Sequence, residues 1–283
     1  MGKPKIIKKS LGQNFLTSVG AIRKIVETAL ECGAEDPANV TVLEVGPGNG
    51  ILTEALLKNF KKVIAVEKDE RLASLLKEKF EKEIRGRRLK IFTDDILGVK
   101  PRNLGIEFPS EYAIIANIPY YITGQFLRQW LSISPWPKYM VLMLQKEVAK
   151  RIVARDGKES LLSISVKVYG EPRYIQTVKR GSFFPTPRVD SAILKIDHIS
   201  KEFFSNLGAN LPNNLEKRFF SLVRAGFSHK RKLLSSNLKK TFILTRFNLS
   251  EIGVDPRSRA EDLRLEDWKC LLGQIIHDPV ENK

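Results

Sequence analysis

The segment Asn117-Ile-Pro-Tyr120 carries residue types that suit chemistry on an aromatic amine. The lone pair of such an amine, adenine N6 for example, is delocalised into the ring, so the nitrogen is a weak nucleophile. The Asn117 side-chain oxygen and the Ile118 backbone carbonyl offer two acceptors that would hold the amine and bias it toward a tetrahedral geometry. Pro119 restricts Ile118 to an extended conformation, and Tyr120 offers a flat face for a base. The motif predicts an acceptor site for an adenine-type amine; the alternative is a strand-ending turn with a buried tyrosine.

A second segment, Gly46-Pro-Gly-Asn-Gly50, lies between a predicted strand and a predicted helix. Glycines in such a turn let the backbone approach a bound nucleotide closely. Glu67 ends the next predicted strand, where an acidic residue hydrogen-bonds ribose hydroxyls in sheets of this kind. The pair Asp94-Asp95 ends the strand after that, and a carboxylate there can accept a hydrogen bond from an adenine amine, although such pairs also cap helices and turns.

The glycine spacing discriminates between two nucleotide cofactors. A dinucleotide site requires G-x-G-x-x-G, in which the last glycine lets a helix pack near the pyrophosphate. Here the spacing is G-x-G-x-G, Ile51 occupies the sixth position, and Glu44 before the turn is atypical of a nicotinamide site. S-adenosylmethionine carries no phosphate, so the spacing favours methyl transfer over hydride transfer. A nicotinamide oxidoreductase and a tight turn without a ligand are the alternatives.

These residues require a sheet whose strand ends share one edge. Near-continuous apolar strands that alternate with helices indicate a parallel sheet covered on both faces. Two further β segments, 164–169 and 192–196, are expected to complete it. The predicted strands are 41–45, 62–67, 89–93, 112–116 and 139–144, and the predicted helices are 18–31, 51–60, 72–84 and 125–131.

The pattern changes near residue 200. No strand pattern follows, and helical periods appear at 214–225, 230–242 and 265–276. We therefore place a domain boundary at 198–212, with an α/β domain over residues 1–200 and a small all-α domain over 201–283. Residues 215–240 contain eight Lys and Arg and one acid, Glu216. With the lysines of the first nine residues they predict a phosphate-binding surface; a solvated helix face is the alternative.

The composition limits the class of protein. The 283 residues include 48 Lys and Arg against 32 Asp and Glu, a net charge of +16 that favours a polyanionic partner, nucleic acid before an anionic membrane surface. The two cysteines, Cys32 and Cys270, and the three histidines are scattered, so we expect neither disulfides nor a metal site. No apolar run is long enough for a signal peptide or a membrane span, which predicts a cytoplasmic protein.

Together the motifs resemble those of one family, the small-subunit ribosomal RNA adenine N6,N6-dimethyltransferases of the KsgA type. The resemblance covers about residues 8–196 and continues more weakly through Phe227–Leu233 and Asp255–Leu263. It implies a Rossmann-like class I methyltransferase domain with a mostly parallel sheet, a small C-terminal all-α domain, and S-adenosylmethionine as methyl donor. The segments that carry it are Leu11-Gly-Gln-Asn-Phe-Leu16, Glu44-Val-Gly-Pro-Gly48, Asn117–Tyr120 and Phe183–Ser191.

The resemblance also implies roles for individual residues. Two aromatic side chains would sandwich the target base, and the choice of Phe184 over Phe183 depends on the alignment. The cofactor would be contacted by residues from the N-terminal motif and from successive strand ends. The implied roles are closure over the cofactor for Asn14 and Leu16, a backbone contact to it for Gly46, ribose binding for Glu67, adenine binding for Asp95, contact with both cofactor and target amine for Asn117, and the base sandwich for Tyr120 and Phe184.

The implied substrate is a pair of adjacent adenosines in the 3′-terminal hairpin of small-subunit ribosomal RNA, within an immature small subunit, with the protein acting as a monomer. One rival is the related 23S ribosomal RNA adenine methyltransferase that confers macrolide resistance, which shares the Asn-x-Pro-Tyr chemistry. Gly12 and the segment Phe183–Ser191 favour the small-subunit type. A second rival is an assembly factor that binds RNA without catalysis, which the intact motif Asn117–Tyr120 disfavours.

Overall fold

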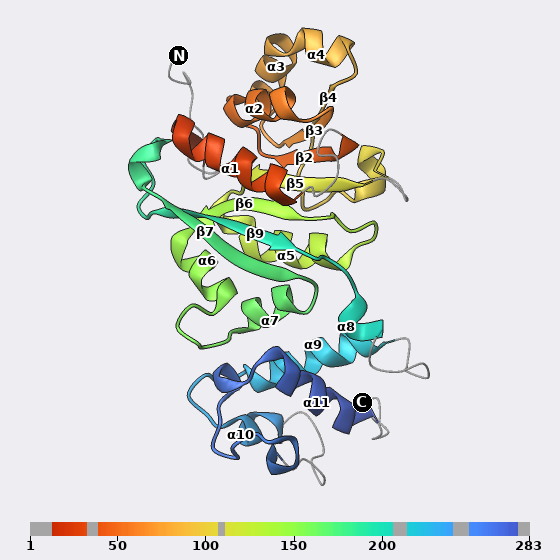
Figure 1. Cartoon of the computed structure of the whole chain (residues 1–283), viewed down its shortest axis with the longest axis vertical. Coiled ribbons are helices and arrows are strands. Elements are labelled where there is room, and N and C mark those ends of the chain that lie inside the picture. The colour runs from red at the N-terminus through yellow and green to blue at the C-terminus, as the bar shows by residue number, and fades with distance from the viewer. Residues whose placement is uncertain (1–12, 33–38, 107–110, 206–213, 240–248, 277–283) are drawn as a thin grey trace. The chain divides into compact units, whose positions relative to one another are not determined.

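The computed structural model describes residues 13–32, 39–106, 111–205, 214–239 and 249–276 (Figure 1). Seven strands form one sheet in the order β4-β3-β2-β5-β6-β9-β7. The five strands from β4 to β6 run parallel to one another, and β9 runs antiparallel between β6 and β7. The strands are β2 (Thr41–Val45), β3 (Lys62–Glu67), β4 (Leu89–Thr93), β5 (Tyr112–Asn117), β6 (Met140–Gln145), β7 (Glu171–Val178) and β9 (Ser191–Asp197).

The chain order of the strands reverses direction across the sheet between β2 and β5. In open sheets of this kind, ligands bind beyond the carboxyl ends of the strands at such a reversal. The carboxyl ends of β2, β3, β4 and β5 therefore share one edge, which is where the sequence places its candidate site residues. The predicted Rossmann-like, mostly parallel sheet followed by a helical part is confirmed.

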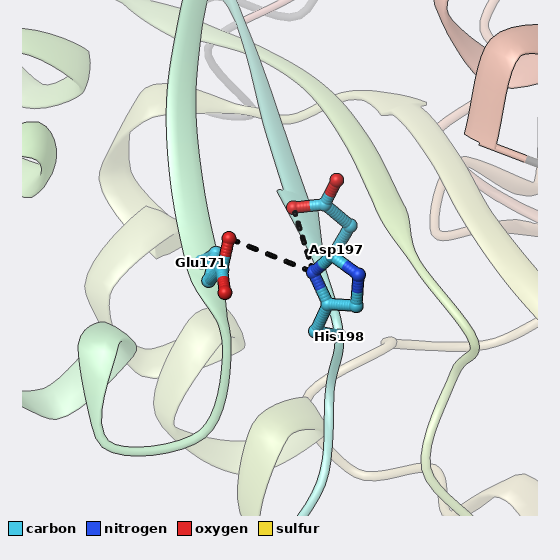
Figure 2. A group of neighbouring side chains, drawn as sticks. All are labelled: Glu171, Asp197 and His198. Atoms are coloured by element: carbon cyan, nitrogen blue, oxygen red, sulfur yellow. Dashed lines mark ion pairs between the residues drawn. The ribbon is translucent and has the colours of Figure 1, made fainter.

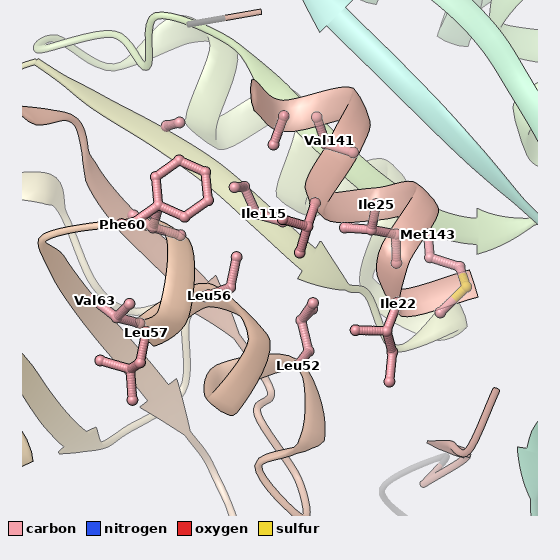
Figure 3. Close-up of a cluster of buried hydrophobic side chains, with 14 of the residues drawn as sticks. Ile22, Ile25, Leu52, Leu56, Leu57, Phe60, Val63, Ile115, Val141 and Met143 are labelled. Atoms are coloured by element: carbon pink, nitrogen blue, oxygen red, sulfur yellow. The ribbon is translucent and has the colours of Figure 1, made fainter. Parts of the chain in front are cut away.

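One face of the sheet is covered by the first helices of the chain. Figure 3 shows Ile22 and Ile25 of α1 and Leu56 of α2 converging on Ile115 and Met143 of the sheet. Side chains alternate between the two faces of a strand, and the alternating neighbours on β5 and β6 are also fully buried. The sheet is thus covered on both faces, as continuous apolar strands predict. The helices before β7 are α1 (Val19–Cys32), α2 (Ile51–Asn59), α3 (Glu70–Lys79), α4 (Glu81–Arg85), α5 (Thr123–Ser132), α6 (Lys146–Val153) and α7 (Leu161–Lys167).

A second, two-stranded sheet joins two distant segments. β1 (Phe15–Leu16) pairs antiparallel with β8 (Phe183–Phe184), placing Phe15 opposite Phe184 and Leu16 opposite Phe183. Beside it, the Thr17 N–H and hydroxyl both donate to the Ser182 carbonyl, at 2.8 and 2.9 Å. The first described residues of the chain are thereby fastened to the segment before β9.

The chain forms two compact units, residues 1–149 with 171–199, and residues 150–170 with 200–283. The predicted division at residue 200 did not anticipate that 150–170 group with the C-terminal helices. These helices are α8 (Glu202–Ser205), α9 (Leu215–Gly226), α10 (Leu234–Leu238) and α11 (Leu265–Ile276). No helix among the described residues is long and apolar enough to cross a membrane.

Three predicted elements differ from the structure. The predicted strand 164–169 is wrong: Ser160 accepts a hydrogen bond from the Ser163 N–H and caps α7, and the strand begins only at Glu171. The predicted helix 72–84 is interrupted at Phe80, which separates α3 from α4. In the predicted helix 230–242, residues 230–233 form a turn before α10, and residues 240–242 lie outside the described residues.

Candidate active site at the strand ends

A pocket opens at the carboxyl ends of β2, β3, β4 and β5 and is closed on one side by residues 13–16. It encloses about 970 Å³, counting the space at its open mouth. The described residues that line it include four acids and a single cation, Lys68, although the chain as a whole carries +16. Seven of the eight predicted site residues line it; Phe184 does not. The seven are Asn14, Leu16, Gly46, Glu67, Asp95, Asn117 and Tyr120.

The glycines between β2 and α2 all adopt left-handed backbone angles, with φ of +64°, +61° and +76° at Gly46, Gly48 and Gly50. A Cβ on Gly48 would lie 2.9 Å from Phe15, and one on Gly50 would lie 2.7 Å from both Leu76 and Phe80. Gly48 and Gly50 are therefore required both because a side chain would clash with neighbouring residues and because of their backbone angles.

Glu67 is buried at the end of β3 and braces the glycine turn. Its carboxylate accepts hydrogen bonds from the Gly48 N–H at 3.1 Å and from the Asp69 N–H at 2.9 Å. Burial raises the pKa of Glu67, although these backbone donors favour its charged form. Asp69 in turn caps α3 and accepts a hydrogen bond from the Gln13 side chain at 3.0 Å. The carboxylate predicted to bind ribose is thus held at a fixed place beneath residues 13–16.

Asp95 stands at the end of β4, on the pocket rim. Its Oδ1 accepts from the Leu97 N–H at 3.1 Å, and its Oδ2 lies 2.6 Å from the Lys68 ammonium. Partial burial opposes ionisation of Asp95, but the hydrogen bond and charge of Lys68 outweigh it and lower its pKa. An ionised acceptor therefore lies where an adenine amine is predicted to bind.

Asn117 ends β5 and lines the pocket. Its side-chain N–H group donates to the Asn14 backbone carbonyl at 3.1 Å. With the amide nitrogen used in this way, Oδ1 is left as an acceptor, and no described residue donates to it. The next residue, Ile118, is held by its N–H, which donates to the Met143 carbonyl at 3.0 Å. Two oxygens, the Asn117 Oδ1 and the Ile118 carbonyl, therefore remain to accept from a substrate amine.

Tyr120 lines the pocket beyond Asn117, and its hydroxyl is hydrogen-bonded to the Ser191 hydroxyl at 2.7 Å. Burial raises the pKa of Tyr120, so the phenol is neutral at physiological pH. On β8, Phe183 is 3% exposed and belongs to the core, while Phe184 is half-buried. Successive side chains of a strand point to opposite faces. Phe184 therefore points away from the core that holds Phe183, as the predicted choice between them requires.

The composition of this pocket fits the chemistry of S-adenosylmethionine. That cofactor carries a sulfonium cation and no phosphate, so a lining that holds the ionised Asp95 and Lys68 as its one described cation suits it, whereas the pyrophosphate of a dinucleotide needs donors and positive charge. The buried carboxylate of Glu67, the rim carboxylate of Asp95 and the strand-end amide of Asn117 all line this one cavity.

A family model described as ribosomal RNA adenine dimethylase matches residues 5–276. The chain belongs to this family. It is 40% identical over 277 residues to Ribosomal RNA small subunit methyltransferase A of Dehalococcoides mccartyi, covering 96% of this chain and 89% of the relative. It is 35% identical over 282 residues to the protein of that name from Bacillus mycoides, covering 95% and 91%.

Two solved structures share the fold over nearly the whole chain. A dimethyladenosine transferase from Plasmodium falciparum is 28% identical with a TM-score of 0.73, covering 92% of this chain and 97% of that one. The 23S rRNA methyltransferase ErmE is 26% identical with a TM-score of 0.70, covering 94% and 100%. Family membership confirms the predicted enzyme class, a ribosomal RNA adenine methyltransferase that uses S-adenosylmethionine.

A second group of titratable side chains lies on β7 and β9, away from the pocket. Glu171 and Asp197 are cross-strand partners, and His198 Nδ1 lies 3.6 Å from Glu171 and 3.8 Å from Asp197 (Figure 2). The other oxygen of Asp197 is 2.5 Å from the Lys195 ammonium. Two carboxylates directly opposite each other repel. We interpret this group as an ion-pair network in which Lys195 pairs with Asp197, and Arg173, 3.2 Å away, pairs with Glu171.

Three of the residues of the predicted basic surface lie on a turn of the helical unit. Lys230, Arg231 and Lys232 are exposed between α9 and α10. The buried amide of Asn237 donates to the Gly226 carbonyl at 2.6 Å and to the His229 carbonyl at 3.0 Å, which fixes the turn. Lys240 and the N-terminal lysines, part of the same prediction, lie outside the described residues.

Several residues that shape the pocket were not predicted. Gln13, Lys68 and Ser191 each hold a predicted site residue or its neighbour through a side-chain hydrogen bond. Gln13 and Ser191 lie inside segments that carry the family resemblance, but nothing in a polar residue type states its partner. Lys68 follows Glu67 directly and has no sequence signal that distinguishes it from a solvated lysine.

Proposed function

We propose that the chain transfers methyl groups from S-adenosylmethionine to N6 of two adjacent adenosines in the 3′-terminal hairpin of small-subunit ribosomal RNA. It acts in the cytoplasm as a monomer on an immature small subunit. The observation that carries the proposal is the orientation of Asn117: its amide nitrogen is engaged by the Asn14 carbonyl, so its oxygen is available to an amine. The names of the curated relatives support the small-subunit substrate over the 23S alternative.

The site residues act by holding the two reactants. Glu67 binds the ribose, Asp95 binds the adenine amine, and Gly46 approaches the cofactor through its backbone. Asn14 and Leu16 close the pocket from the N-terminal side. When bound, S-adenosylmethionine supplies an electrophilic methyl group.

On the acceptor side, the Asn117 Oδ1 and the Ile118 carbonyl each accept a hydrogen bond from the target amine. The two bonds aim the nitrogen lone pair at the methyl carbon. The alkylated nitrogen is strongly acidic and loses its proton without a dedicated base. Tyr120 and Phe184 stack on the two faces of the base, which must leave its own stack to enter the site. Proximity and orientation of this kind supply about 7–11 kcal/mol of barrier reduction.

The first test is primer extension on ribosomal RNA after unmethylated small subunits are incubated with the protein and S-adenosylmethionine. Dimethylated adenosines stop the polymerase, so we expect stops at two adjacent positions near the 3′ end. Stops only in large-subunit RNA, with intact ribosomes as substrate, would contradict the proposed substrate and favour the 23S alternative.

A second test concerns the acceptor residue. We expect Asn117→Ala to lower methyl transfer by roughly a hundredfold or more, because the amine loses an acceptor that positions it. The thermal unfolding midpoint is expected to change little. Asn59→Ala is a matched control, since Asn59 also donates its amide to a backbone carbonyl, that of Ala55 at 2.8 Å, but lies on the outer end of α2. Wild-type turnover in Asn117→Ala would remove the proposed mechanism.

A further inference from the structure

Ser191 has no exposed surface, yet its hydroxyl reaches the acceptor side of the pocket. Its Oγ lies 2.7 Å from the Tyr120 Oη. Ser191 is the first residue of β9 and pairs with Gln145 of β6 on one side and with Val178 of β7 on the other. Because neighbouring strands fix its backbone from both sides, the position of this hydroxyl is set by the sheet.

Tyr120 needs such an anchor. It begins a short 3-10 turn, Tyr120–Ile122, directly after Pro119, and it is half-buried. A tyrosine side chain has two torsions, and its hydroxyl oxygen lies on the axis of the second, so a hydrogen bond at that oxygen fixes where the ring lies. Removing the partner of a partly buried phenol hydroxyl leaves that hydroxyl without a hydrogen bond, which costs free energy.

The segment that leads from Phe184 to Ser191 is itself fastened beside Tyr120. The Arg180 N–H donates to the Asp190 carboxylate at 3.0 Å, and the Lys146 N–H donates to the Asp190 carbonyl at 3.0 Å. The Lys179 and Lys146 ammonium groups lie 3.6 and 3.8 Å from the same carboxylate. One end of this segment thus carries Phe184 and the other end holds the Tyr120 hydroxyl.

We propose that Ser191 is a positioning residue, whose hydroxyl fixes the place of the Tyr120 ring on the acceptor side of the pocket so that the target base stacks on it. The inference rests on the proposed function, in which Tyr120 and Phe184 receive the base. Since Ser191 belongs to β9, the sheet itself would help to set the geometry of the acceptor site. Among the described residues, none on the cofactor side is hydrogen-bonded to this hydroxyl.

The test compares Ser191→Ala, Ser191→Cys and Tyr120→Phe in methylation of small subunits, with kcat, KM for the subunit and Kd for S-adenosylmethionine measured separately. Loss of one neutral hydrogen bond predicts a fall in kcat of about three- to tenfold. The cofactor Kd is expected to be unchanged. Because Ser191→Ala and Tyr120→Phe break the same bond, the double variant is expected to be no slower than the slower single variant. Cysteine fills the space of serine but is a weak donor, so Ser191→Cys is expected to stay slow.

The chain offers a matched control on β7. There the Tyr174 hydroxyl is hydrogen-bonded to the Thr177 hydroxyl at 2.6 Å, outside the pocket. Thr177→Val removes the same kind of bond, and we expect kcat to be unchanged. Full activity in Ser191→Cys, or additive losses in the double variant, would show a packing role and overturn the inference. An inactive wild-type protein would overturn the proposed function and this inference with it, whereas an active wild type with an equally active Ser191→Ala would overturn the inference alone.

Discussion

Replacing Glu44 with glutamine is expected to change how the stability of the protein depends on pH. Glu44 is 1% exposed at the carboxyl end of β2, and its Oε2 accepts a hydrogen bond from the Thr53 hydroxyl at 2.7 Å. Burial raises the pKa of Glu44 from 4.5 to about 8. The Thr53 hydrogen bond and the Lys79 charge oppose this shift, and the Glu67 carboxylate adds to it.

The sign of the effect follows from the proton that the native state retains. Between pH 4.5 and 8 the unfolded chain ionises this group while the folded chain keeps it protonated. The contribution of Glu44 to the free energy of unfolding is therefore greatest below pH 4.5, falls as pH rises, and levels off above pH 8. One proton corresponds to a slope of about 1.4 kcal/mol per pH unit, or roughly 5 kcal/mol across the window. That is a large part of the roughly 5–15 kcal/mol by which a domain is stable.

Denaturant unfolding of the wild type and of Glu44→Gln at pH 5, 7 and 8.5 measures the effect. Glutamine keeps an oxygen to accept from Thr53 and does not titrate, so the stability advantage of Glu44→Gln should grow with pH. Glu54→Gln is the control on α2, because the side chain of Glu54 is 42% exposed and its hydrogen bond with Lys58 lowers its pKa. A constant difference between wild type and Glu44→Gln at all three pH values would refute the reasoning.

Two further predictions concern the glycine turn and the basic turn. Gly50→Ala should destabilise the protein by roughly 1–3 kcal/mol, because its Cβ would lie 2.7 Å from Leu76 and Phe80 at a φ of +76°; an unchanged unfolding midpoint would contradict this. Reversing the charges at Lys230, Arg231 and Lys232 should weaken subunit binding and reduce its dependence on salt by roughly 0.7–0.9 log units per lost phosphate contact, with cofactor Kd unchanged. Equal subunit affinity and salt slope in the reversed variant would exclude this surface.

The cofactor half of the site could be predicted because its residues end successive parallel strands. Gly46, Glu67 and Asp95 each follow an apolar run, and parallel strands bring their carboxyl ends to one edge. Chain order and spacing therefore determine which side chains meet. The same local reasoning failed at 164–169, where a short apolar run suits a strand or a buried helix equally and the Ser160 cap decides for the helix.

The acceptor half depends on contacts that residue types do not encode. The Asn14 carbonyl orients Asn117 across 103 residues of sequence, and Ser191 holds Tyr120 across 71. Both partners are polar groups whose local sequence is compatible with a solvent-exposed loop. The sequence therefore predicts the acceptor residues without the groups that hold them in place.

These long-range contacts give the two halves a common support. The strand β1 contributes Phe15 to the pocket wall and pairs it with Phe184, while Asn14, one residue earlier, fixes the amide of Asn117. Gly48 packs against the ring of Phe15, so the cofactor turn abuts the same strand. A change that displaces β1 must therefore disturb the glycine turn, the acceptor amide and the Phe184 strand together. Methyl transfer requires donor and acceptor to be aligned at the same time. We therefore interpret β1 as the element that keeps the cofactor side and the acceptor side of the pocket aligned.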